Sequence, residues 1–600
     1  MFLRVHLRKK DGKEHRYWSI VENRRLRDAR VAQKTVLYLG EINDTQRGAW
    51  QKSLEVFDED EGKRKQMRLF VSDREIPATA LDVVQVKLSE MELRRARSFG
   101  DCWLGVTLWE ELELRHFWEE RLPQGREAVS WVKVLELLTV NRLIAPGSEW
   151  SIHRHWFDVS AMDELLGEDF VLAEKNRLYR CLDRLLKHKE ALFSHLQKRW
   201  KDLFGAKFDI LLYDLTSTYF EGEMELVCKA KHGYSRDKRF DCRQVVIALV
   251  ITAEGFPLAY EVLPGNTSDK TTLRDFLKKI EDQYGKANRV WVMDRGIPTE
   301  EILGEMRSAE TPVSYLVGTP RGRLTQLEKS FMALPWEKVR SSVEVKLLKN
   351  EGEVYVLAKS TGRRNKEQAM RKRKLKKLWA TLAKLKTQKL TRDELLLKLG
   401  AARKEAGRAW GLVKITVPEK NETQAHACFD YRLNKKKLRQ TRKREGCYLL
   451  RSNLTGENPE VLWERYIQLT EIEAAFKCLK SELAIRPIFH WLAHRVEAHI
   501  FVAFLAYCLM VTLKKRLSPH APGLTPGAVL EKLSTIQMID VHFPTTDGRH
   551  LVMPRYTQPE KEHLLILEKL KLNLPPQPPP RIYAHQIAKP CSGNLRAHHS

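Results

Sequence analysis

The chain has 600 residues, of which 43% are hydrophobic, so it is long enough for several domains with cores of their own. Its 105 lysine and arginine residues outnumber 78 acidic residues, and the net charge of +27 favours a polyanionic partner such as nucleic acid, although a membrane-surface binder or a merely basic protein has the same excess. The nine cysteines form no C-x-x-C pair, which argues against a zinc site or a disulfide framework and favours a reducing cytoplasm.

Residues 1–95 predict a small, basic, β-rich module. Short runs such as "FLRVHLR" and "KTVLYLG" alternate apolar and polar residues, and polar turns separate them. The N-terminus lacks the apolar run of a signal peptide. Residues 96–200 have a helical pattern, with an amphipathic and basic second half. This region is either a DNA-binding unit or a plain helical bundle, and its pattern does not separate the two.

Residues 201–320 change to an α/β pattern. The run "FDILLYD" predicts a strand, and "RQVVIALVITAEGFPLAYEVLPGN" predicts two more around a turn. A helix, the strand "VWVMD", a second helix and the strand "VSYLVGT" follow. Three strands, a helix, a strand, a helix and a strand make the order of an α/β domain.

Residues 321–444 do not continue that order and read as a β-rich, basic insertion. They begin with the strand-like segments "VEVKLLKN" and "EVYVLAKS", and a basic helical stretch follows at 361–380. Basic runs are often solvated surface. Here Trp379, Trp410 and Tyr431 flank the basic runs, which favours a nucleic-acid-binding surface.

Residues 445–545 return to the α/β pattern, with a strand, the helix 466–483 and an apolar run at 500–513. That run is too short to span a bilayer, so we expect a buried core helix. Residues 546–600, with the proline-rich "LPPQPPPR", predict a C-terminal tail without a fold of its own.

Three acidic residues occur where carboxylates are costly unless they have a function. Asp214 and Asp294 each follow an apolar strand, and Glu473 lies on the later helix. Carboxylates that converge from two strands and a helix can hold two Mg²⁺ for an in-line phosphoryl displacement. Other nearby acids fit less well, because they face the opposite side of a strand, lie in loops or point elsewhere on the helix: Asp209, Asp237, Asp241, Asp269 and Glu471.

The stretch "YIQLTEIEAAFKCLKSEL" carries Tyr466, Glu473 and Lys480 at intervals of seven residues. Seven residues are almost two helical turns, so on one continuous helix these side chains form a single stripe. A phenol, a carboxylate and an ammonium group in one stripe are not typical of a helix face that packs into a core.

The segments "LLYDLTSTYFEG", "EVLPGNTSDKTTL", "VWVMDRGIPTEE" and the stretch that starts at Tyr466 together resemble the DDE transposases of bacterial insertion sequences. More narrowly, the chain resembles the branch with a long β-rich insertion between the second Asp and the Glu. The N-terminal "YWSIVENRRLRDARVAQKTVLYLGEI" is similar to the opening of that branch, so the resemblance covers most of the chain in matching order.

The resemblance implies an RNase H-like catalytic core interrupted by the insertion. It implies that Asp214, Asp294 and Glu473 are the catalytic, metal-binding triad for two Mg²⁺ ions, with Mn²⁺ as a substitute. Tyr466 and Lys480 match positions that contact DNA phosphate in the family. The same motif often has an Arg three residues after the Tyr; here that position is Leu469.

The implied function is Mg²⁺-dependent DNA cleavage and strand transfer at the ends of an insertion sequence, by a cut-and-paste route. The partners would be the terminal inverted repeats and target DNA, bound by a homodimer on paired ends, without a membrane, on the bacterial nucleoid in the cytoplasm. In relatives an aromatic residue of the insertion holds a flipped base, for which Trp336, Trp379 and Trp410 are candidates.

Two other functions are compatible with the same residues. One is a metal-dependent nuclease on the same RNase H-like core that cuts DNA but never joins strands. The other is a non-catalytic DNA-binding protein from a decayed element, which the intact triad argues against.

Overall fold

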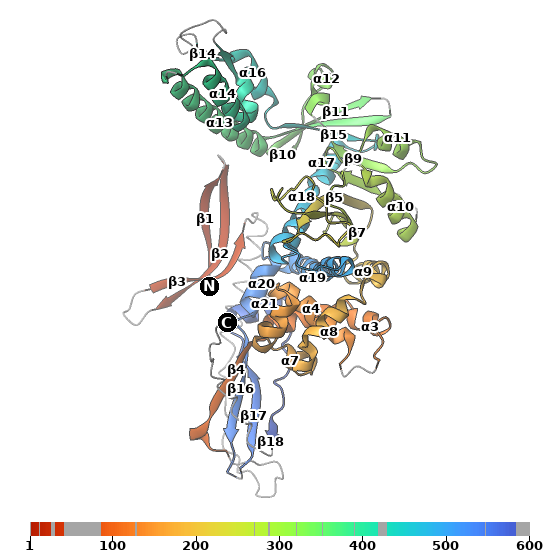
Figure 1. Ribbon diagram of the computed structural model, residues 1–600, viewed down its shortest axis with the longest axis vertical. Helices are drawn as coiled ribbons and strands as arrows, with labels where there is room; N and C mark the ends of the chain where they lie inside the picture. Colours follow the sequence, from red (N-terminus) through yellow and green to blue (C-terminus); the bar gives the residue numbers. More distant parts are fainter. Residues whose placement is uncertain are drawn as a thin grey trace.

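The computed structural model describes residues 2–10, 13–25, 31–40, 86–125, 129–268, 271–285, 289–319, 321–350, 352–388, 390–417, 429–546 and 548–583. The described parts form an elongated molecule (Figure 1). A large sheet lies in the upper half of the view, helices lie in the middle, and a second sheet lies at the lower end.

Five strands form the expected RNase H-like core, in the spatial order β7-β6-β5-β8-β9. The strand β6 pairs antiparallel with β5 and β7, whereas β8 and β9 run parallel to β5. The predicted order of strands and helices is confirmed. The elements are β5 (Ile210–Tyr219), β6 (Gln244–Thr252), β7 (Pro257–Pro264), α10 (Leu273–Tyr284), β8 (Val290–Met293), α11 (Glu300–Ser308) and β9 (Ser314–Gly318).

Hydrophobic packing on both faces explains why these strands are so apolar. The strand β6, with the sequence "QVVIALVIT", is buried along its whole length. Alternate residues of β5 pack into two different cores, with Leu212 on one side of the sheet and Leu211 and Tyr213 on the other. Strands that helices cover on both faces read as continuous hydrophobic runs rather than as alternating ones.

Three strands of the insertion and β15, which follows it, enlarge the core sheet to nine strands. The first hairpins of the insertion pair antiparallel with one another, and β15 then joins them to the edge strand β9, where Leu450 lies opposite Gly318. The strand-rich part of the insertion is therefore continuous with the catalytic core. The added elements are α12 (Arg321–Met332), β10 (Glu337–Arg340), β11 (Val343–Asn350), β12 (Glu353–Ser360) and β15 (Cys447–Ser452).

The rest of the insertion is a mostly helical arm that projects at the top of Figure 1. It has its own small hydrophobic core, which includes Leu382, Leu399 and Phe429. The expectation of a β-rich segment over 321–444 thus holds for its first strands, while its basic second half is mainly helical. The arm consists of α13 (Thr361–Thr387), α14 (Arg392–Ala406), η6 (Gly407–Leu412), β13 (Val413–Thr416), β14 (Asp430–Leu433) and α16 (Lys435–Arg444).

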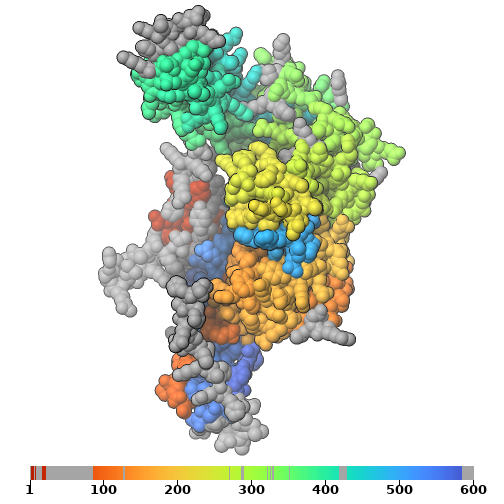
Figure 2. Space-filling view, viewed as in Figure 1, coloured from red at the N-terminus to blue at the C-terminus, as the bar shows by residue number. Residues whose placement is uncertain are grey.

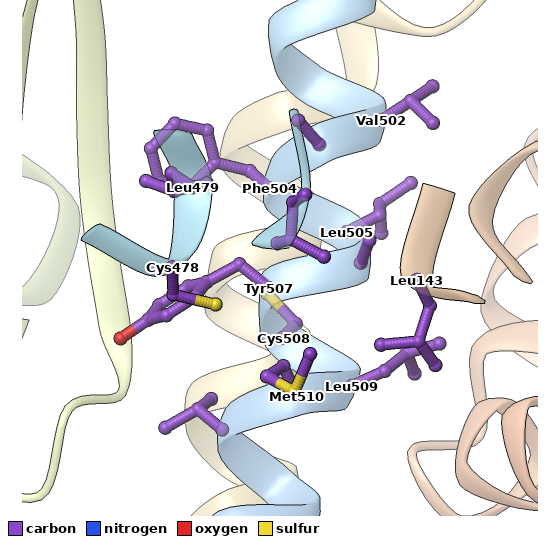
Figure 3. Close-up of a cluster of buried hydrophobic side chains, with 14 of the residues drawn as sticks. Leu143, Cys478, Leu479, Val502, Phe504, Leu505, Tyr507, Cys508, Leu509 and Met510 are labelled. Atoms are coloured by element: carbon purple, nitrogen blue, oxygen red, sulfur yellow. The ribbon is translucent and has the colours of Figure 1, made fainter. Parts of the chain in front are cut away.

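The helix α19 (Ala493–His520) is the central element of the helical layer. By composition it could cross a membrane, but 94% of its most apolar window is buried inside the protein, as expected for a core helix. Figure 3 shows its side chains Val502, Phe504 and Leu505 in a cluster with Leu143 and Leu479. The apolar run at 500–513 is therefore a core helix, as the sequence predicts.

The predicted helical region 96–200 packs around α19 and continues to the edge of the core sheet. Because its apolar residues are used in this packing, the structure has the helical bundle that the sequence left as one alternative. Its longer helices are α2 (Gly100–Glu111), α3 (Leu114–Glu119), α4 (Trp131–Ile144), α7 (Met162–Leu166), α8 (Lys175–Leu182) and α9 (Lys189–Phe204).

Residues 548–583 are folded, which corrects the prediction of a structureless C-terminal tail from residue 546. The strands β16 (Gln537–Pro544) and β17 (His550–Tyr556) form an antiparallel hairpin, so the predicted boundary at 545 falls between paired strands. The boundary at 95 likewise cuts β4 (Glu92–Ser98), which pairs with β16. Sequence-local patterns could not reveal a sheet that joins two ends of the chain. The sheet also includes β18 (Arg581–Tyr583), and α21 (Lys561–Leu570) follows β17.

The N-terminal module contains the predicted antiparallel strands, β1 (Phe2–Lys10), β2 (Lys13–Arg25) and β3 (Val31–Gly40). Residues 41–85 of that module lie outside the described residues, as do Asp269 and residues 584–600.

Candidate active site

The strand register places Asp214, Asp294 and Gly318 in a row across three neighbouring strands. Leu212 of β5 lies beside Val292 of β8, which lies beside Leu316 of β9. Side chains alternate along a strand, so the residues two positions further share the same face of the sheet. Those residues are Asp214 in the middle of β5, Asp294 directly after β8, and Gly318 at the end of β9.

The helical stretch after the insertion covers this face. Tyr466 lies on α17 (Pro459–Ile467) and Glu473 lies on α18 (Leu469–Lys477). A pocket of about 330 Å³ lies between this stretch and the sheet, and its lining includes Asp214, Asp294, Tyr466 and Glu473. The structure thus brings the three predicted carboxylates to one pocket, although 178 residues separate Asp294 from Glu473 in the chain.

The Tyr466 hydroxyl donates a hydrogen bond to Oδ1 of Asp294 across 3.4 Å. Burial raises the pKa of Tyr466 above its usual value, and the nearby charge of Asp294 adds to the rise. The phenol is therefore protonated at physiological pH and acts as a donor. The backbone N–H groups of Leu215 and Arg295 donate to Asp214 and Asp294, at 2.8 and 2.7 Å, which fixes each carboxylate next to its own strand.

The expected stripe of Tyr466, Glu473 and Lys480 on one continuous helix is not present. A turn at Gln468 separates α17 from α18, and Lys480 lies in a π-helical segment, η7 (Cys478–Glu482). Because a π-helical turn is wider than an α-helical one, the spacing of seven residues no longer keeps Lys480 on the side of Glu473.

Lys480 has a different environment from Tyr466 and Glu473. Its Nζ donates to Oδ1 of Asp237 at 3.0 Å, and each of these side chains is only 11% exposed. Arg486 contacts the same carboxylate. Burial alone would raise the pKa of Asp237, but the hydrogen bonds from Arg486 and Lys480 outweigh it and lower that pKa. Lys480 is therefore held in an ion pair outside the pocket lining.

The acids that the sequence ranked lower lie away from the pocket lining. Glu471 pairs with Lys514 of α19 at 2.5 Å, so it points to the other side of α18, as predicted. Asp241 pairs with Arg239 at 3.0 Å on the surface. Asp209 precedes β5, and its carbonyl accepts a hydrogen bond from Val290.

The pocket is also lined by two arginines that the sequence did not predict as site residues, Arg295 and Arg363. Arg363 belongs to the first turn of α13. The Ser360 side chain caps this helix by accepting a hydrogen bond from the backbone N–H of Arg363. Its guanidinium lies 4.7 Å from the ring centre of Tyr448, another pocket residue. Leu469, where the family motif often has Arg, also lines the pocket and is mostly buried. The basic run at 361–380 was the only sequence signal for Arg363.

The chemistry of the pocket fits a hard divalent cation, because three carboxylates supply oxygen ligands from rigid elements. The three carboxylates form a loose set. Among the described His, Cys, Asp and Glu residues, a closer group, with ligand atoms all within 4.8 Å of one another, is formed by Glu149, His490 and His499. That second group lies in a different recess.

The three tryptophans of the insertion do not line this pocket. Trp336 lies in a separate recess, where Lys346 and Lys359 approach its ring at 4.8 and 5.2 Å. Trp379 packs edge-on against Tyr431 within the helical arm, and Trp410 packs against the core of the arm.

Comparison with known proteins identifies the class to which this fold and pocket belong. The transposase DDE domain family matches residues 209–509, half of the chain, and the N-terminal domain of IS1634 family transposases matches residues 3–61. The chain therefore belongs to the DDE transposases. It is an insertion-sequence transposase, an enzyme that binds DNA and cleaves it with a divalent metal.

A solved structure, the piggyBac transposase synaptic complex with hairpin DNA, is similar to this chain with a TM-score of 0.34 and 9% sequence identity. The similarity covers 74% of this chain and 82% of that one. No curated protein matches the sequence.

Proposed function

We propose that Asp214, Asp294 and Glu473 are the catalytic triad and hold two Mg²⁺ ions, which Mn²⁺ can replace. The observation that carries this proposal is the convergence of the three carboxylates on one pocket from β5, the end of β8 and α18. Bound divalent ions supply charge stabilisation for the attacking and leaving oxygens of a phosphoryl displacement.

The other pocket residues position the DNA. Tyr466, which burial and Asp294 keep protonated, can turn its single hydroxyl proton from Asp294 to a phosphate oxygen next to the cut. Arg295 and Arg363 add positive charge at the pocket. We assign phosphate contact to these groups rather than to Lys480, which pairs with Asp237 outside the pocket lining.

The reaction that we propose is cut-and-paste transposition. Hydrolysis frees a 3′-OH at the element end, and this hydroxyl then attacks another phosphodiester in the same or in target DNA. We propose a homodimer on two paired ends, with the N-terminal modules recognising the inverted repeats and the basic arm binding DNA backbone. We further propose that it acts on the nucleoid in the bacterial cytoplasm, which suits the free cysteines of the described chain.

The triad is tested with a duplex that carries the element's terminal inverted repeat and flanking DNA, in the presence of Mg²⁺. We expect Asp294→Asn and Glu473→Gln to slow cleavage on the order of a thousandfold, because several kcal/mol of transition-state stabilisation are lost. Duplex binding, measured without metal, stays as in the wild type.

Glu471→Gln is the matched control, because Glu471 lies on the same helix but pairs with Lys514. Equal cleavage by Glu473→Gln and Glu471→Gln would contradict the triad. A second assay with pre-cut ends distinguishes a transposase from a nuclease on the same core, since only a transposase yields joined product.

A further inference from the structure

A second recess, of about 740 Å³, lies where the segment after Glu473 meets the helical region. Its lining includes the cations Arg142, Lys175, Arg180, Arg486 and Arg495, with Glu149 as the acid among them. In Figure 2 the blue surface between the yellow part of the core and the orange helices has the colour of this segment. The recess is thus rich in cations, and its lining shares no residue with that of the carboxylate pocket.

The segment that forms one wall presents two aromatic rings to solvent. Ile488 and His490 are buried, whereas Phe489 and Trp491 are 56% and 72% exposed. This alternation is that of an extended chain, which turns successive side chains to opposite sides. Single exposed apolar side chains are common on this surface, but here two large rings lie on one side of the same segment, at the wall of a recess lined with cations.

The floor of the recess is a hydrogen-bonded network that holds this wall in place. Nε2 of His490 lies 3.4 Å from Oε1 of Glu149. Arg142 can only donate, so Nδ1 of His499 accepts its hydrogen bond at 3.4 Å, and Nε2–H of His499 donates to the Ile485 carbonyl at 3.3 Å. Because both nitrogens of His499 are used and a guanidinium stands beside them, this group acts as a rigid support and not as a metal site.

Two of the cations at the rim are available to a ligand. Arg486 and Arg495 pair with Asp237 and Asp183. Lys175 and Arg180, by contrast, pair with no carboxylate of the described chain. Lys175 lies 4.6 Å from the ring centre of Trp150, which keeps its charge at the edge of the recess.

We propose that this recess binds a single-stranded segment of the DNA substrate, with bases stacked on Trp491 and Phe489 and phosphates held by Lys175 and Arg180. Exposed aromatic rings beside unpaired cations are the two components of a single-strand binding surface. The inference rests on DNA being the substrate, and it does not depend on the assignment of the triad.

The size and place of the recess favour single-stranded over duplex DNA. Its volume is that of a small-molecule pocket, which admits one or two nucleotides but not the width of a double helix. The rings can stack only on bases whose faces are free. Ile488 forms a bridge with Phe220, six residues past Asp214, which puts the recess roughly 20 Å from that carboxylate along the strand. One DNA molecule can therefore reach both sites.

The test is fluorescence anisotropy with the full-length protein in EDTA, which prevents cleavage. The probes are a labelled deoxythymidine decamer and a blunt duplex of the same length. We expect Phe489→Ala/Trp491→Ala to weaken decamer binding about tenfold or more while duplex binding changes less than about twofold, because stacking acts only on unpaired bases. Lys175→Ala/Arg180→Ala should weaken decamer binding and reduce its salt dependence.

Matched controls are Phe240→Ala, an aromatic residue that is 63% exposed and lines neither recess, and Lys198→Ala, an exposed lysine on α9. Both should bind the decamer as the wild type does, and melting curves check that every variant is folded. Unchanged decamer affinity in the aromatic variant, an equal loss for both probes, or a wild type that does not bind the decamer would each overturn the proposal. Asp294→Asn should bind the decamer normally, so a failure of the triad is seen separately.

Discussion

The hydroxyl of Tyr466 lies 3.4 Å from Oδ1 of Asp294 and donates to it, although 172 positions separate the two residues in the chain. This contact joins the helix that follows the insertion to the strand that precedes it. Space for it exists because residue 318, at the end of β9, is glycine. A Cβ atom there would lie 2.6 Å from the Tyr466 hydroxyl and 3.4 Å from Oδ1 of Asp294.

We expect Gly318→Ala to reduce DNA cleavage without unfolding the protein. The new methyl group must displace the Tyr466 hydroxyl, so the variant should resemble Tyr466→Phe, which lacks that hydroxyl. A hydrogen bond to a charged group contributes about 1.5–3 kcal/mol, so a loss of tenfold or more in the cleavage rate is expected for both. Single-turnover cleavage of an inverted-repeat duplex measures it.

Gly304→Ala is the control for this prediction. Gly304 lies on α11, and an added Cβ would meet no atom within 4 Å. Alanine also favours the helix by about 1 kcal/mol, so this variant should cleave normally and melt at the same or a higher temperature. If Gly318→Ala cleaves as fast as Gly304→Ala, the Tyr466 hydroxyl is not required for the reaction.

Much of the core could be predicted because its signals are local. Each strand and helix from 209 to 318 has its own apolar pattern, and the parallel pairing of β5 with β8 places Asp214 and Asp294 side by side, although β5 continues five residues beyond Asp214. The position of Arg363 could not be predicted, because it depends on the pairing of β12 with β15 and of β15 with β9. Lys480 was wrongly placed on the stripe of Glu473, since a π-helical segment leaves no mark in a spacing of seven residues.

Lys480 should matter more for stability than for binding DNA. Its ion pair with Asp237 ties the segment after Glu473 to the loop between β5 and β6, and both side chains are largely buried. Lys480→Met leaves the carboxylate with a missing partner, which costs about 1–3 kcal/mol, so the melting temperature should fall by several degrees. Adding Asp237→Asn should cost less than the sum of the two single changes.

Lys477→Met is the matched control, because Lys477 is exposed one helical turn earlier. It should melt close to the wild type. A Lys480→Met protein with an unchanged melting temperature but weaker binding to the inverted repeat would instead identify Lys480 as a phosphate contact, as the family motif implies.

Arg363 should contribute to cleavage although it belongs to the insertion. Its side chain is 41% exposed, contacts Glu367 and lies over Tyr448 at the pocket. We expect Arg363→Ala to slow cleavage about tenfold and to lower the slope of binding against salt concentration by roughly one phosphate contact. Arg363→Lys should restore the salt dependence of binding better than the cleavage rate, because lysine keeps the positive charge but lacks the planar fork of arginine.

Lys366→Ala, an exposed change on the same helix, controls for the general charge of α13. It should alter the salt dependence slightly and leave the single-turnover cleavage rate unchanged. Equal cleavage rates for Arg363→Ala and Lys366→Ala would show that Arg363 does not act in the pocket.

Glu136 makes the stability of the helical region dependent on pH. It lies on α4, has no exposed surface and stands 3.0 Å from Arg115. Burial outweighs the opposing charge of Arg115 and raises the pKa of Glu136 from 4.5 to about 8. Between these two values the native protein keeps a proton that the unfolded chain releases, so stability falls as pH rises through this window and levels off above it.

We therefore expect Glu136→Gln, which is neutral at every pH, to become more stable relative to the wild type as the pH rises from 5 to 9. The gain in the free energy of unfolding should be on the order of a few kcal/mol, and melting curves over this pH range measure it. Glu110→Gln is the matched control, because Glu110 contacts the same Arg115 but is 46% exposed. Its difference in melting temperature from the wild type should stay constant over this range. Parallel melting profiles for the two variants would mean that Glu136 is ionised in the native protein and that Arg115 compensates for its burial.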